Sequence, residues 1–110
     1  METIVNENQR RVEVCVSPAL FPTYFTKKEC IVVVIDVFRA TSAICTAFHN
    51  GVKGIIPVLT VEEAKQYQSQ GMIVAAERSG EIVEGFDIGN SPFSYMNDEM
   101  KGKEVVLTTT

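Results

Sequence analysis

The feature that most constrains the fold is a run of five β-branched residues, Ile31–Ile35, followed closely by an amphipathic segment. β-Branched side chains favour strands, and a run without polar interruption is typical of a strand buried on both faces of a parallel sheet. In the segment behind it, apolar residues recur at intervals of three and four, which predicts a helix with one face on a core. These residues are Ala40, Ala43, Ile44, Ala47 and Phe48.

Strand-like and helix-like segments continue to alternate along the chain. Thr60 and Glu63 have the spacing of a capping box, which predicts the start of a second helix. Pro57 places its strand at a sheet edge or strand end, because proline has no N–H to donate. We expect strands at 11–16, 31–35, 52–58, 72–76 and 104–107, helices at 40–48 and from Thr60 to about Gly71, a loop or short helical turn at 17–28, and a helical turn within 91–100.

Strands that alternate with helices predict an α/β fold with three layers, α/β/α, around a mostly parallel or mixed sheet. The length of 110 residues suffices for one domain, which we place at residues 11–110 behind a polar arm at residues 1–10. The last strand runs into Thr108–Thr110 with no helix to cover it. We therefore expect the sheet to be incomplete at its C-terminal end.

Composition excludes several classes of protein. The net charge of −4 argues against a basic footprint for nucleic acid. No apolar run approaches the roughly 20 residues of a membrane-spanning helix, and the polar N-terminus does not have the pattern of a secretory signal. The three cysteines contain no CxxC pair, which argues against a disulfide framework or a zinc cluster. We expect a cytoplasmic protein that binds neither nucleic acid nor membranes.

Acidic and hydroxyl side chains follow three of the predicted strands. Asp36 follows the run of β-branched residues, Glu77 follows the strand at 72–76, and Thr108–Thr110 follow the last strand. Ligands of open parallel sheets bind beyond the carboxyl ends of the strands. We therefore expect these side chains to meet at one edge of the sheet.

The clearest motif is Asp36-Val-Phe-Arg39-Ala-Thr41-Ser42, at the start of a predicted helix. Helix N-termini favour anions, and the guanidinium of Arg39 suits two oxygens of a phosphate or sulfonate. Asp36 is a poor phosphate ligand but a good magnesium ligand, so a metal with a phosphate accounts for all these residue types. A structural alternative stays open, in which Asp36 caps the helix and Arg39 is its ion-pair partner.

Residues 77–92 form a second polar stretch, which is long for a loop in a small domain, and such loops are often functional. Its glycines permit positive φ angles and close approach of the backbone. Asp87 supplies a further carboxylate, Arg78 a second cation for an anion, and Asn90 and Ser91 further polar groups. Turn formation alone is the structural alternative for this stretch.

Other phosphate-binding signatures do not match. The sequence contains no GxxxxGK[ST] loop and no GxGxxG fingerprint. A phosphatase of the haloacid dehalogenase type needs an acid two residues after the first aspartate, and this chain has Phe38 there.

The assembled motifs resemble the 2-phosphosulfolactate phosphatase family over most of residues 11–110. The stretches Val34–Ser42 and Gly85–Pro92 are specific in combination, and their order and spacing agree with the family. The second of these stretches begins at Glu84, and the other matching stretches are 50–53, 56–58, 60–64, 77–78, and 101–103 leading to 107–110.

The resemblance implies a magnesium-dependent phosphatase that hydrolyses 2-phospho-3-sulfolactate to 3-sulfolactate and phosphate, a step toward coenzyme M. It also implies that the family continues past Thr110, and that this chain covers about the N-terminal half. Two alternatives are a non-catalytic half-domain, which pairs with missing strands or with a second copy of itself, and a module that binds a small anion without chemistry.

As a hypothesis, we expect Asp36 and Arg39 to be the catalytic residues. We expect Asp36 to hold Mg²⁺ with help from Glu77 or Asp87, and either a metal-bound water or Asp36 itself to attack phosphorus. The expected substrate-binding residues are Arg39, Thr41, Ser42, Arg78, Asn90, Ser91, Thr108, Thr109 and Thr110.

Overall fold

The computed structural model describes residues 12–25 and 30–110. The predicted polar arm at residues 1–10 and the first residue of the predicted strand at 11–16 lie outside the described residues. The chain falls into two compact units, one that ends at Val33 and a second from Val34 to Thr110. Each unit is described by itself.

The second unit contains a mixed sheet of four strands in the order β1-β4-β2-β3. The strands β1 (Gly54–Pro57), β4 (Glu104–Thr108) and β2 (Ile73–Arg78) are parallel, and the short strand β3 (Glu81–Ile82) is antiparallel to β2. The predicted α/β fold with a mostly parallel sheet is confirmed. β1 lies at the edge of the sheet, as Pro57 predicted.

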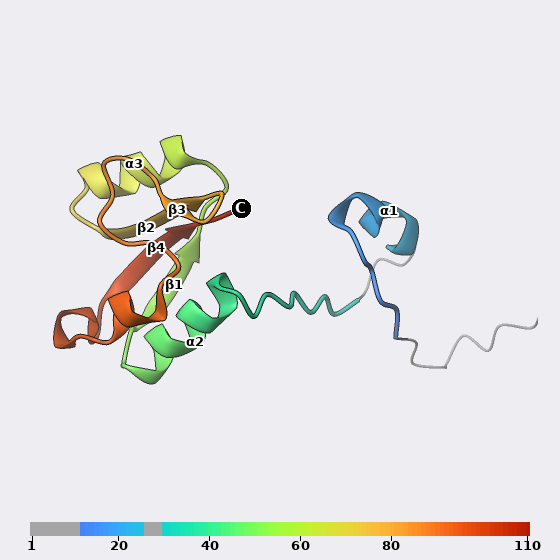
Figure 1. Ribbon diagram of the computed structural model, residues 1–110, viewed down its shortest axis with the longest axis horizontal. Coiled ribbons are helices and arrows are strands. Elements are labelled where there is room, and N and C mark those ends of the chain that lie inside the picture. Colours follow the sequence, from blue (N-terminus) through green and yellow to red (C-terminus); the bar gives the residue numbers. More distant parts are fainter. Residues whose placement is uncertain (1–11, 26–29) are drawn as a thin grey trace, which may run out of the picture. The chain divides into compact units, whose positions relative to one another are not determined.

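Two helices cover opposite faces of this sheet (Figure 1). The helix α2 (Ala40–His49) packs with Val105 and Leu107 of β4 in one apolar cluster. The helix α3 (Val61–Ser69) packs through Ala64 with Val106 in a second cluster. Alternate residues of β4 thus face the two helices, because successive side chains of a strand point to opposite faces. The three layers predicted from the sequence are α2, the sheet and α3.

The strand buried on both faces is β4, whose residues after Glu104 are all buried. It lies between β1 and β2, with Val105 opposite both Ile55 and Ile73. A run of apolar residues is what such a central position requires.

The start of α3 has the predicted cap. The backbone N–H of Glu63 donates to the hydroxyl of Thr60 at 3.1 Å, and the carboxylate of Glu63 accepts from the N–H of Leu59 at 3.2 Å. Two N–H groups that a helix or its entry leaves unpaired are thereby satisfied.

The predicted loop after residue 77 contains structure that the sequence pattern did not indicate. β2 continues through Arg78 and turns back into β3, with positive φ angles of 53° at Ser79 and 82° at Gly80. Ile88 then forms a parallel bridge with Ala75 of β2. The helical turn predicted within 91–100 is present as two short 3₁₀ helices, η2 (Pro92–Tyr95) and η3 (Asp98–Met100).

The first unit contains a 3₁₀ helix, η1 (Pro18–Leu20), and a single turn of helix, α1 (Phe21–Tyr24), within the stretch expected to be loop or short helix. The rings of Phe21 and Phe25 stack with centroids 5.2 Å apart. The strand predicted at 11–16 is wrong for its described residues, 12–16, which form no strand and are exposed. Alternating valines favour a strand only where a neighbouring strand supplies hydrogen bonds.

The prediction of a buried strand at Ile31–Ile35 is also wrong. These residues have no regular secondary structure and are exposed, Ile31 at 94% and Ile35 at 81%. β-Branched side chains favour a strand through packing on neighbours, and no strand among the described residues pairs with this run. Asp36 is therefore held by the start of α2 and not by the end of a strand.

No helix within residues 12–25 and 30–110 is both long enough and apolar enough to cross a membrane.

Tyr95 is the largest fully buried side chain beneath α2. Its hydroxyl donates to the carbonyl oxygen of Gly89 at 3.1 Å. Burial, and secondarily the negative charge of Glu77, raise the pKa of Tyr95 to about 12.

We expect Tyr95 to make the free energy of unfolding depend on alkaline pH. Its folded pKa lies above the unfolded value of about 10, so its contribution is complete below pH 10 and is lost as the pH rises through 12. The loss is about 3 kcal/mol, and Tyr95→Phe removes it. Urea denaturation at pH 8, 10, 11 and 12 measures the free energy of unfolding of both proteins. The titration of lysines and of the other tyrosines is common to both proteins and cancels in the difference between them. Parallel pH profiles for the two proteins contradict this prediction.

Gly89 is packed too closely for any side chain. A Cβ atom there would lie 2.9 Å from Cγ1 of Ile82 and 3.0 Å from Oε2 of Glu77. At Gly54 the nearest atoms would lie at an ordinary 3.8 Å.

We expect Gly89→Ala to lower the free energy of unfolding by about 1–3 kcal/mol, because the added methyl group overpacks a filled site. Gly54→Ala is the matched control, since neither glycine has a positive φ angle, and it loses no stability. Urea denaturation measures both variants. Equal midpoints for the two variants contradict the close packing at Gly89.

Candidate active site at the C-terminal edge of the sheet

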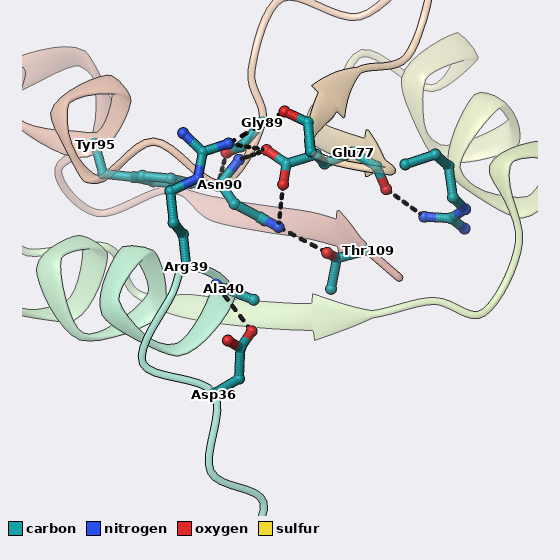
Figure 2. A network of polar contacts seen from close by, with 10 residues as sticks. Asp36, Arg39, Ala40, Glu77, Gly89, Asn90, Tyr95 and Thr109 are labelled. Carbon is teal, nitrogen blue, oxygen red and sulfur yellow. Dashed lines mark hydrogen bonds and ion pairs between the residues drawn. The ribbon is translucent and has the colours of Figure 1, made fainter. Parts of the chain in front are cut away.

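The carboxyl ends of β1, β4 and β2 lie at one edge of the sheet because the three strands are parallel. This edge carries Glu77 and Arg78 from β2, Thr108 from β4, and Thr109 just after it. The segment after β3 brings Asn90 to the same edge, and the loop before α2 brings Arg39 (Figure 2). Two of the three predicted strand ends therefore meet here.

The buried carboxylate of Glu77 is the centre of a polar network (Figure 2). Oε2 accepts from Nη2 of Arg39 at 2.8 Å and from the backbone N–H of Asn90 at 2.9 Å. Oε1 accepts from Nδ2 of Asn90 at 3.0 Å. A buried charge needs a partner and hydrogen bonds to be stable, and Glu77 has both.

Arg39 links this buried carboxylate to the surface. Its side chain is 43% exposed, against 8% for the side chain of Glu77. Nη2 contacts Glu77 and, at 3.4 Å, the carbonyl oxygen of Gly80. Nη1 and Nε have no hydrogen-bond partner among the described residues, so they are available for an anion.

Asn90 connects Glu77 to Thr109. Its Nδ2 donates to Oγ1 of Thr109 at 2.7 Å as well as to Glu77. Its Oδ1 is buried and has no hydrogen-bond partner in the described part of the chain. Such an unsatisfied acceptor is costly in a protein interior.

Asp36 lies at the N-terminus of α2. Its Oδ2 accepts from the N–H of Ala40 at 3.1 Å, and its carbonyl oxygen accepts from the N–H of Thr41 at 3.2 Å. The hydroxyl of Ser42 donates to the carbonyl oxygen of Val37. The carboxylate of Asp36 thus accepts from the first residue of the helix, as in the structural alternative, although Arg39 occupies the N-cap position. The ion-pair partner of Arg39 is Glu77 and not Asp36.

Arg78 connects β2 with β4 and with the segment at Leu59 through hydrogen bonds. Nη2 donates to Oγ1 of Thr108 at 2.7 Å and to the carbonyl oxygen of Leu59 at 3.2 Å. Nη1 donates to the carbonyl oxygen of Glu77 at 2.7 Å. All of these acceptors are uncharged, so Arg78 leaves a positive charge at this edge.

Asp36, Thr41 and Ser42 bond at the start of α2 and not to the network around Glu77. Three further predicted site residues do not join this network either. Ser91 precedes η2 and accepts from the N–H of Ser94 through its carbonyl oxygen. Thr110 is exposed at the last position. Asp87 is exposed and lines a pocket with Met72 and Ile73, at the opposite end of β2 from Glu77.

The three predicted magnesium ligands do not fit one metal ion as a set. Both oxygens of Glu77 accept from donors, one of them the cation of Arg39, and Asp87 lies at the other end of β2. No group of three or more His, Cys, Asp or Glu residues within 12–25 and 30–110 is arranged to hold a metal. Asp36 keeps one carboxylate oxygen without a partner in the part of the chain that is described.

Tyr95 and Gly89 support the site but were not identified as site residues from the sequence. The hydroxyl of Tyr95 holds the carbonyl of Gly89, directly before Asn90. The sequence analysis noted only that the glycines of this stretch permit close approach, and a single tyrosine in a turn gives no signal of its role.

Comparisons with known proteins match most of this chain to one family. The family model described as 2-phosphosulpholactate phosphatase matches residues 15–110. A probable 2-phosphosulfolactate phosphatase of Thermotoga petrophila is 51% identical over 78 residues, which cover 71% of this chain and 34% of that protein. One from Clostridium botulinum strain Eklund 17B is 51% identical over 87 residues, 76% of this chain and 37% of that protein.

The matched residues thus span about a third of the length of these curated relatives, which agrees with the expectation that this chain corresponds to only part of such a protein. The family match covers both the motif at Asp36–Ser42 and the stretch that carries Asn90. The chain belongs to the 2-phosphosulfolactate phosphatase family.

Proposed function

We propose that this chain supplies the phosphate-binding part of a phosphatase site that hydrolyses 2-phospho-3-sulfolactate to 3-sulfolactate and phosphate. Membership of the family supports the reaction. The single observation that carries the proposal is the guanidinium of Arg39, which the buried carboxylate of Glu77 holds at the sheet edge with two nitrogens free for an anion.

The substrate class follows from the charges that it carries. A phosphorylated sulfolactate has phosphate, sulfonate and carboxylate groups, all of which accept hydrogen bonds from arginine. Arg39 is assigned to the phosphate, because its free nitrogens form a planar fork. Arg78 adds positive potential along the same edge, where Thr108 accepts from it, and the hydroxyl of Thr109 adds a donor. Thr41, Ser42 and Ser91 belong to the proposed binding set as well.

Hydrolysis breaks the bond between phosphorus and the ester oxygen, and water supplies the oxygen and the protons of the products. Arg39 stabilises the charge on the phosphate oxygens as that bond breaks. Asp36 is the proposed catalytic carboxylate, either as the nucleophile or as the group that orients the attacking water. Magnesium dependence is also part of the proposal, with Asp36 as the ligand that this chain supplies.

We expect Asp36→Asn to lower phosphate release at least about 100-fold. The amide oxygen of asparagine can still accept from the N–H of Ala40, since asparagine caps helices as well as aspartate does. The loss therefore reports the negative charge and not the helix. The assay uses a chimaera in which this chain replaces the matching segment of the Clostridium botulinum relative.

Two controls accompany this assay. Thermal unfolding of Asp36→Asn should match that of the unsubstituted chimaera, and EDTA should stop phosphate release until Mg²⁺ is added back. Unchanged turnover in Asp36→Asn eliminates the assignment of Asp36. Binding of inorganic phosphate without any turnover favours the alternative of a small-anion binding module.

The exposed apolar run before Asp36 supports a second candidate, in which the chain alone is inactive and this run pairs with other strands or with a second copy. Ile31 is 94% exposed and Ile35 is 81% exposed, and exposed patches of this kind mark interaction surfaces.

A reducing, cytoplasmic setting is part of either proposal and is supported by three free, exposed cysteines, Cys15, Cys30 and Cys45.

We expect the chain by itself to self-associate in size-exclusion chromatography, because the run leaves apolar surface in water. The double substitution Val33→Lys/Ile35→Lys adds charge to the run and should shift the chain toward the monomer. The control Leu59→Lys changes a single exposed apolar residue elsewhere and should not. A monomeric unsubstituted chain contradicts pairing of the run with a second copy, and a monomer that also fails to bind hydrophobic dyes contradicts the candidate as a whole.

A further inference from the structure

The carboxylate of Glu77 accepts three hydrogen bonds, which is more than packing alone requires. The donors are Nη2 of Arg39, the backbone N–H of Asn90 and Nδ2 of Asn90, all within 3.0 Å. A metal ion at the same carboxylate would lie beside the positive charge of Arg39 and be repelled by it. The environment of Glu77 is thus that of an anion that holds donors in place.

We propose that Glu77 is a positioning residue of the phosphatase site and not a magnesium ligand. It fixes the guanidinium of Arg39 directly and the hydroxyl of Thr109 through Asn90, so that both present hydrogen-bond donors to the phosphate of the substrate. This inference rests on the function proposed above, and it assigns the binding groups of that site.

The first part of the inference concerns Arg39. An arginine with 43% of its side chain exposed would otherwise sample many rotamers. Glu77 holds Nη2 at 2.8 Å and leaves Nη1 and Nε without partners within the described residues. The exposed side of the guanidinium is therefore the side that can bind an oxyanion.

The second part concerns Asn90 and Thr109. The amide of Asn90 has one orientation, since a flip would place Oδ1 against the carboxylate of Glu77, which can only accept hydrogen bonds. The unsatisfied Oδ1 shows that the donor side of the amide decides its orientation. Oγ1 of Thr109 accepts from Nδ2 at 2.7 Å, so its own proton is free to be donated. Asn90 links Thr109 to Glu77 (Figure 2). In the proposed site, this arrangement makes Thr109 a donor toward a ligand.

The test compares Glu77→Gln, Arg39→Gln and the double variant in the chimaera with the Clostridium botulinum relative. We expect each single substitution to raise KM for phosphosulfolactate about 10- to 100-fold, the range of a hydrogen bond to a charged group. The double variant should raise KM by less than the product of the two single effects, because part of the effect of Glu77 passes through Arg39 and only the part through Asn90 and Thr109 is left. Glu104→Gln, the same change at an exposed ion pair of 3.9 Å at the other end of β4, should keep the KM of the unsubstituted protein.

Magnesium titration separates positioning from metal binding. The concentration of Mg²⁺ for half-maximal activity should be unchanged in Glu77→Gln. A rise of about 10- to 100-fold, typical of a lost metal-site group, overturns the proposal. Effects of Glu77→Gln and Arg39→Gln that multiply in the double variant overturn it too.

Thr109 gives a test that does not depend on the folding of Glu77→Gln. Thr109→Val removes the hydroxyl and should raise KM about 10-fold, and Thr109→Ser should restore the original KM. Equal KM values for Thr109→Val and the unsubstituted protein overturn the role of Asn90 and Thr109.

Failure of the proposed function is distinguishable from failure of the positioning role. If the unsubstituted chimaera does not release phosphate from phosphosulfolactate, the proposed function is wrong. The positioning role is then tested by calorimetric titration of this chain with inorganic phosphate. Weaker binding in Glu77→Gln and in Arg39→Gln, with a loss in the double variant smaller than the product of the two single losses, supports it, and no binding or equal binding in all variants overturns it.

Discussion

The structure of the sheet edge depends on the solvation of one buried carboxylate. Glu77 is 6% exposed, and a carboxylate at that depth is stable only if charge and hydrogen bonds replace the water that it has lost. Arg39 supplies the charge, and the segment at Asn90 supplies two N–H donors. The close approach of Gly89 and the hydrogen bond from Tyr95 place that segment where its donors reach Glu77. The loop at Asn90, the strand β2 and the start of α2 at Arg39 are therefore connected through the carboxylate of Glu77.

Most elements of the second unit could be predicted from the sequence because their signals are local. The apolar period of α2, the cap of α3 at Thr60 and the proline of the edge strand β1 each act over a few residues. The central strand could not be identified in this way. Ile31–Ile35 has the stronger β-branched run, yet Val105–Leu107 occupies the buried position, because strand order is set by long-range pairing and not by propensity.

The candidate site was predictable to the extent that strand direction determines it. Parallel strands deliver Glu77, Thr108 and Thr109 to one edge whatever their partners are, so these residues were found from their positions after apolar runs. Which donor meets which acceptor depends on strand register and on the path of the loops. The sequence therefore did not indicate that Arg39 pairs with Glu77, or that Asp87 lies away from both. The bridge of Ile88 to Ala75 sets that loop path, and no local pattern encodes it.

The ion pair between Arg39 and Glu77 has a thermodynamic consequence. A long, rotamer-rich side chain usually loses conformational entropy when it binds a ligand. Here part of that entropy is already lost when the chain folds, since Glu77 holds one nitrogen of the guanidinium in the unliganded state. Preorganisation of this kind links the affinity for an anion to the stability of the fold, so changes in the apolar layers beneath the edge also alter how tightly the anion is bound.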